Sequence, residues 1–259
     1  MDKITAIALT TFRELVRSSV LYIVLFFAAA IVLLAAALGS VTIGDQLLVI
    51  KDFGLASASF FSVIFAVIAG TQLLHKELSR KTIYNILSKP VERRQFLGGK
   101  FLGMLITTAC LIACLNAALM LFVGLMSGQA DWLLAYAGLY MLLEAAVICA
   151  AAIFFSSLVV TPVLSGLFTL GFFLAGRAAD YLLYFVNEGS VSGLIASTLG
   201  ILHALLPQLA RLNVSNAVVF HDWTLLGAVR FFWAALYSLG YAAVLLILAN
   251  LIFKRRDFN

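Results

Sequence analysis

The chain has 259 residues, of which 64% are hydrophobic and only 11% are charged. A soluble domain of this length does not carry so little charge, so the composition excludes a soluble protein and indicates an integral membrane protein. The net charge of +5 would favour nucleic-acid binding in a soluble protein. In a membrane protein the basic residues report topology instead, and we expect no nucleic-acid partner.

Residues 2–18 are predicted to form an amphipathic helix that lies in the cytoplasmic interface of the membrane. Apolar side chains recur there at helical spacing, and charged side chains occupy the other side: Ile4, Ala8, Phe12 and Leu15 against Lys3, Arg13, Glu14 and Arg17. The alternative is a simple cytoplasmic extension of the first membrane span.

Long charge-free runs predict the membrane spans, because about 20 apolar residues cross the hydrocarbon core as a helix. The runs are continuous rather than alternating, so helices are favoured over a β-barrel. The predicted spans are residues 20–39, 53–74, 103–126, 132–155, 161–183 and 230–252. We therefore expect one all-α transmembrane domain over residues 1–259, with an even number of spans that places both termini on the same side.

Lysine and arginine residues gather in three places. Three lie before the first span, seven between residues 75 and 102, and three at the C-terminus. The positive-inside rule places both termini and the 75–102 segment in the cytoplasm.

Residues 187–226 separate the fifth and sixth spans. Gly189–Ala210 carries no formal charge, but it contains three glycines and Pro207, and a crossing there would break the even number of spans. We expect one or two short helices at the outer surface, or a re-entrant segment that dips into it.

No residue pattern typical of an enzyme is visible. Gly99-Lys100 is followed by Phe101 and therefore departs from a phosphate-binding loop. The three histidines are dispersed, and all three cysteines lie in predicted spans. We expect no metal, no cofactor bound by this chain and no catalytic activity.

The segment Glu77–Gly103 resembles the permease subunits of type-2, exporter-like ATP-binding-cassette transporters. The resemblance rests on Thr82-Ile-Tyr-Asn-Ile-Leu-Ser-Lys-Pro-Val, on Arg93, and on Phe96-Leu-Gly-Gly-Lys-Phe-Leu-Gly. It implies a bacterial inner-membrane protein that pairs with a second permease copy or a paralogue. It also implies two separate ATPase subunits that carry the ATP and Mg, and it is compatible with a periplasmic accessory protein.

The same resemblance implies a surface that couples the permease to its ATPase subunits. The residues carried over to this surface are Glu77, Lys81, Thr82, Lys89, Pro90, Val91, Arg93 and Arg94.

Polar residues inside the spans are the candidates for a transport pathway or gate. Glu144 falls near the middle of the fourth span, where a charge is costly unless it faces protein or water. The alternative to a role in a pathway or gate is that Glu144 is a neutral carboxyl group hydrogen-bonded to a neighbouring helix. Asn116 is a second candidate, or an interhelical hydrogen-bond donor. Arg177 and Asp180 are three residues apart and are expected to form an ion pair at the outer end of the fifth span.

Together these features predict a permease subunit that moves a substrate, lipidic or amphipathic, outward. The alternative is a non-transporting membrane anchor or mechanotransducer that couples a cytoplasmic ATPase to a periplasmic partner. An intramembrane enzyme is disfavoured because no paired catalytic residues occur.

Overall fold

The computed structural model describes residues 3–41, 45–79, 92–129, 131–159, 161–187, 194–220 and 227–255. The described residues form helices and turns without a β-strand. The helices are α1 (Lys3–Val16), α2 (Ser19–Val41), α3 (Gln46–Ser79), α5 (Arg93–Ser127), α6 (Leu133–Leu158), α7 (Pro162–Asn187), α8 (Leu194–Leu205), the 3₁₀ helix η1 (Leu209–Leu212), α9 (Ser215–Val219) and α10 (Ala228–Arg255).

Six of these helices, α2, α3, α5, α6, α7 and α10, are long and apolar enough to cross a membrane. The predicted all-α membrane fold with six spans is therefore confirmed. Short helices α8, η1 and α9 lie between the fifth and sixth of them, within the 187–226 region.

The helices α3 and α5 are longer than predicted. The prediction began the second span at residue 53, but α3 begins at Gln46 and includes Lys51, which pairs with Asp131 at 2.6 Å. Because that charge has a partner, it is tolerated near the end of the span. The 75–102 segment is helical at both of its described ends, as expected for a helix that extends the second span and a turn that leads into the third, since α3 continues to Ser79 and α5 begins at Arg93.

Helix α6 is the centre of the bundle and packs against α3, α5, α7 and α10. Most of its side chains are buried. Small residues allow its neighbours to come close: a Cβ atom on Gly70 of α3 would overlap the side chain of Ala152. The candidate polar residue Glu144 therefore lies on a helix with protein on several sides.

Helix α1 packs against the first half of α5 through two glycines four residues apart. A Cβ atom on Gly99 would lie 2.7 Å from Cβ of Ile7, and one on Gly103 would lie 2.6 Å from the carbonyl oxygen of Ala8. We call this contact the glycine seam, because the two helices approach so closely only where α5 has no side chain.

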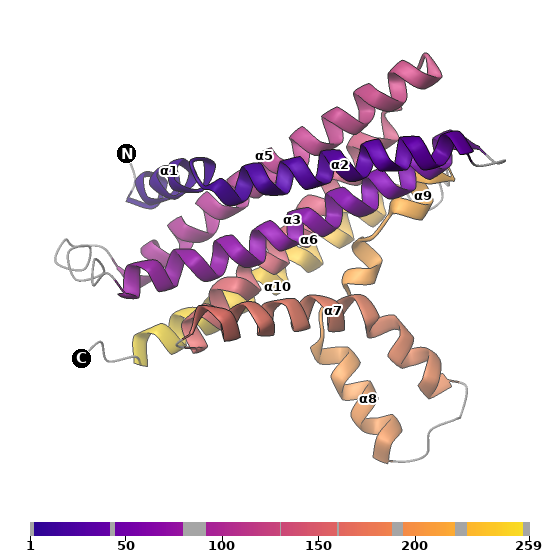
Figure 1. Cartoon of the computed structure of the whole chain (residues 1–259). Coiled ribbons are helices and arrows are strands. Elements are labelled where there is room, and N and C mark those ends of the chain that lie inside the picture. The colour runs from indigo at the N-terminus through magenta and orange to yellow at the C-terminus, as the bar shows by residue number, and fades with distance from the viewer. Residues whose placement is uncertain are drawn as a thin grey trace.

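Figure 1 shows that α1, the end of α3, the start of α5 and the end of α10 lie at the same end of the bundle. This arrangement matches the expectation that an even number of spans brings the chain ends together.

The last part of α7 turns away from the bundle, and α8 runs back beside it (Figure 1). The chain then returns to the bundle at Pro207, whose carbonyl oxygen would lie 2.8 Å from a Cβ atom on Gly176. Tyr241 of α10 donates a hydrogen bond to the carbonyl oxygen of Leu205 at 2.9 Å. These contacts fix the returning segment against both α7 and α10.

Candidate functional site

Three spanning helices each place one polar side chain at a common point inside the bundle. Ser59 comes from α3, Glu144 from α6 and Arg177 from α7. Glu144 is only 2% exposed, whereas about a third of the Arg177 side chain is accessible. We call these three residues the ion-pair cluster.

The guanidinium of Arg177 binds both carboxylate oxygens of Glu144. Its Nε atom lies 3.2 Å from Oε1, and its Nη2 atom lies 3.3 Å from Oε2. Nη2 also donates to the hydroxyl oxygen of Ser59 at 2.9 Å, and this hydroxyl donates to Oε2 of Glu144 at 3.1 Å. The three groups therefore close a ring of hydrogen bonds that joins α3, α6 and α7.

The ring explains how the bundle accommodates a carboxylate on its central helix. Two-point pairing of arginine with a carboxylate is among the stronger hydrogen-bonded geometries in proteins. The planar guanidinium also lies over the ring of Phe173, one turn earlier on α7, with Cζ 5.5 Å from the ring centroid. Because a buried charge is costly when it is unpaired, each member depends on the others.

The predicted ion pair between Arg177 and Asp180 is replaced in the structure by two other contacts. Arg177 points into the bundle toward Glu144, while Asp180 lies near α8, with Oδ1 3.9 Å from Nε2 of His203. The two residues are close on α7, but the interior offers the arginine a buried carboxylate. A buried partner on another helix therefore takes the place of a local partner.

Asn116 lies at the contact between α5 and α6, where its amide nitrogen would be 3.2 Å from a Cβ atom on Gly138. It donates to the carbonyl oxygen of Ile112 on its own helix at 3.1 Å, and lies 3.8 Å from the sulfur of Met141. Among the described residues, no hydrogen bond or ion pair links Asn116 to the ion-pair cluster. The two pathway candidates thus occupy different helix contacts.

The predicted coupling residues lie at the end of the bundle where α3 ends and α5 begins. Glu77 is in the last turns of α3, and Arg93 is the first residue of α5. The exposed side chain of Arg94 forms an ion pair with Glu92 at 3.1 Å. The remaining candidates, Lys81, Thr82, Lys89, Pro90 and Val91, lie outside the described residues.

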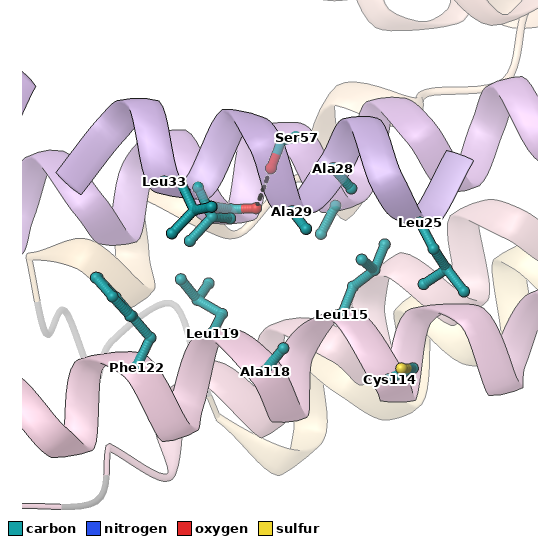
Figure 2. Close-up of a pocket in the computed structure, with 13 residues that line it drawn as sticks. Leu25, Ala28, Ala29, Leu33, Ser57, Cys114, Leu115, Ala118, Leu119 and Phe122 are labelled. Atoms are coloured by element: carbon teal, nitrogen blue, oxygen red, sulfur yellow. Dashed lines mark hydrogen bonds between the residues drawn. The ribbon is translucent and has the colours of Figure 1, made fainter. Parts of the chain in front are cut away.

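An apolar cavity of about 400 Å³ lies between α2, α3 and α5 (Figure 2). Leu25, Ala28, Ala29 and Leu33 of α2 face Leu115, Ala118, Leu119 and Phe122 of α5 across it. Its visible polar groups are few: the hydroxyl of Ser57, which donates to the carbonyl oxygen of Gly54 at 2.9 Å, and the thiol of Cys114. The cavity is suited to hydrocarbon rather than to a charged group.

Two features, Ser59 and the glycine seam, were not predicted from the sequence. Ser59 carries no local signal, because its partners lie far along the chain. Gly99 and Gly103 did carry one, since small residues four apart mark close helix contacts in membranes.

The comparisons agree with this architecture. The comparison with curated protein sequences found no match. The family model described as "ABC-2 family transporter protein" matches residues 5–258, which is nearly the whole chain. The chain therefore belongs to the ABC-2 transporter family, and it is a multi-pass membrane permease subunit of an ATP-binding-cassette transporter that works with ATPase partner subunits.

Proposed function

We propose that this permease forms a dimer, with a second copy or a paralogue, and moves a lipidic or amphipathic substrate outward. Two ATPase subunits bind the 75–102 segment from the cytoplasm and carry the ATP and Mg. The protein lies in a bacterial inner membrane with both termini in the cytoplasm and α1 in the membrane interface. The basic segments and the grouping of helix ends at one end of the bundle support this orientation.

The force of ATP binding enters at Arg93 and Arg94, the first residues of α5. The glycine seam holds α1 against α5 directly beyond this point, so a push on the start of α5 also moves α1. Helix α5 in turn packs against α3 and α6. Closely packed helices move as rigid bodies rather than deforming, which favours transmission along the bundle.

The ion-pair cluster is the observation that carries the proposal, and we assign it the role of a gate. It ties α7 to α3 and α6 one residue after Gly176, the position on which Pro207 packs. Beyond this point α7 leaves the bundle (Figure 1). Separation of Arg177 from Glu144 would release the outer part of α7 and the segment that returns to it. In this mechanism the ring opens and closes once in each transport cycle.

A lipidic substrate is supported by the cavity between α2, α3 and α5. Its walls are alanine, leucine, valine and phenylalanine side chains with few polar groups. A cavity of this kind accepts an acyl chain without leaving polar groups unpaired.

The experiment is a reconstitution of the permease with its ATPase subunits in proteoliposomes containing fluorescent phospholipids. We expect Glu144→Gln and Ser59→Ala to slow outward movement of the lipid by at least tenfold while complex assembly and ATP hydrolysis persist. Ser62→Ala is the matched control, because Ser62 is also a buried serine of α3 but, among the described residues, bonds only to its own helix, at the carbonyl oxygen of Ser59.

The proposal is wrong if Glu144→Gln transports lipid at the wild-type rate. The mechanotransducer alternative gains support if the wild-type complex moves no lipid and its ATPase activity instead depends on a periplasmic protein. A loss of assembly in the Ser62→Ala control would show that the serine substitutions report folding rather than gating.

A further inference from the structure

A cavity of about 560 Å³ lies between η1 and the first turns of α10. It is lined by Gln208, Arg211, Leu212, Arg230, Trp233, Ala234 and Tyr237. We call it the arginine pocket. It is separate from the ion-pair cluster and from the apolar cavity, with which it shares no residue.

Both arginines of the pocket are exposed. Within the described part of the chain, neither guanidinium has a hydrogen bond or an ion pair with another residue. Two uncompensated positive charges from separate elements thus face one cavity. Arginine presents a planar fork of donors that matches the oxygens of a phosphate group, so the pocket favours a phosphate over a neutral ligand.

The walls of the pocket are held in place by contacts that do not involve the arginines. The backbone N–H of Gln208 donates to the hydroxyl of Tyr237 at 3.0 Å. Leu212 is 2% exposed and anchors η1 in the core. Because the scaffold is fixed by other groups, replacing the arginines changes the charge of the pocket while its walls keep their support.

An apolar strip continues from the pocket along α10. Trp233 and Tyr237 border the pocket near the start of this spanning helix, where aromatic residues typically lie at the boundary between water and lipid. Val244 and Leu248 follow two and three turns after Tyr237 on the same helix face, and both are exposed. The surface therefore offers positive charge at one end and hydrocarbon contact along its length.

We propose that the arginine pocket binds the phosphate headgroup of an anionic phospholipid whose acyl chains lie along α10. Arg211 and Arg230 hold the phosphate, and Trp233 and Tyr237 flank the glycerol region. The proposal is independent of transport, because the same site serves whether the lipid is moved or stays bound.

The test uses the purified full-length chain in a neutral detergent, with phosphatidylglycerol as the probe and native mass spectrometry to count bound lipid. Phosphatidylcholine tests the need for net negative charge, and glycerol 1-phosphate tests the need for acyl chains. The variants are Arg211→Gln, Arg230→Gln and their combination. Arg13→Gln, an exposed arginine on α1, is the control for a general loss of positive charge.

We expect the double variant to bind phosphatidylglycerol at least tenfold more weakly than the wild type, each single variant to lie between them, and Arg13→Gln to match the wild type. Equal binding of phosphatidylcholine, or no loss in any arginine variant, would overturn the proposal. Wild-type affinity for glycerol 1-phosphate equal to that for the lipid would also overturn it, since the site would then bind small anions. Each variant must elute from a size-exclusion column at the wild-type volume, which shows that it is folded. If the double variant does not, the binding of the two single variants decides between the outcomes.

Discussion

At the α1 end of the bundle two helices meet at glycines, whereas in its interior three helices meet through polar side chains. The glycine seam depends on missing side chains at Gly99 and Gly103. The ion-pair cluster depends on full hydrogen bonding among Ser59, Glu144 and Arg177. A close-packed contact resists added volume, while a polar contact resists the loss of a partner. The two regions should therefore respond to opposite kinds of substitution.

The largest effect should come from removing one charge of the ion-pair cluster. Glu144→Ala leaves the guanidinium of Arg177 without its carboxylate, and breaking a buried pair in this way costs about 3 kcal/mol or more of folding stability. Titration of detergent-solubilised protein with a denaturing detergent measures this cost. The double variant with Arg177→Ala should lose less than the sum of the two single losses. Strict additivity would mean that the two side chains act independently.

A smaller effect should come from adding one methyl group to the glycine seam. Gly99→Ala places a Cβ atom 2.7 Å from Cβ of Ile7, and overpacking of this kind costs about 1–3 kcal/mol. Its neighbour is the control: a Cβ atom added to Gly98 would meet no atom of another helix within 4 Å, so Gly98→Ala should be neutral or stabilising by roughly 0.5–1 kcal/mol. The temperature of half unfolding in detergent distinguishes them, and equal temperatures would contradict a close seam.

The smallest effect on stability should come from the exposed end of α5. Combined Arg93→Glu and Arg94→Glu removes the exposed ion pair of Arg94 with Glu92, and a surface pair of this kind is worth about 1 kcal/mol or less. The same change should nevertheless release the ATPase subunits, as co-purification would show. Glu92→Gln removes the same ion pair but keeps both positive charges, and it should leave the complex intact. An ATPase that stays bound and coupled to the doubly reversed protein would disprove the coupling surface.

The spans could be predicted from sequence because hydrophobic length is a local property. Their ends were less accurate where a charged residue has a distant partner: the charge of Lys51 favours the end of a span, yet the residue lies within α3 because Asp131 pairs with it. A distant partner also explains why the ion pair predicted for Arg177 was wrong. Spacing along one helix names Asp180 as its neighbour, while the tertiary packing of α6 and α7 supplies Glu144.

Among the functional residues too, local features could be predicted from the sequence and distant partners could not. Glu144 could be identified from sequence because any carboxylate in a span is unusual, but its partners could not. The roles of Arg93 and Arg94 came from a family resemblance, and the structure adds that α5 begins there. The arginine pocket had no sequence signal, since its two arginines belong to separate elements, η1 and α10.

The central position of α6 has a consequence for how freely the sequence can vary. In its most apolar stretch 78% of the residues are buried within the protein, against 17% for α2. A side chain that faces lipid can be exchanged for another apolar one at little cost, whereas a side chain of α6 must fit its neighbours in shape. Saturation mutagenesis should find exposed α2 positions outside the apolar cavity, such as Phe26 and Leu34, permissive to leucine, isoleucine, valine and phenylalanine alike. It should find α6 intolerant of most exchanges among the same four.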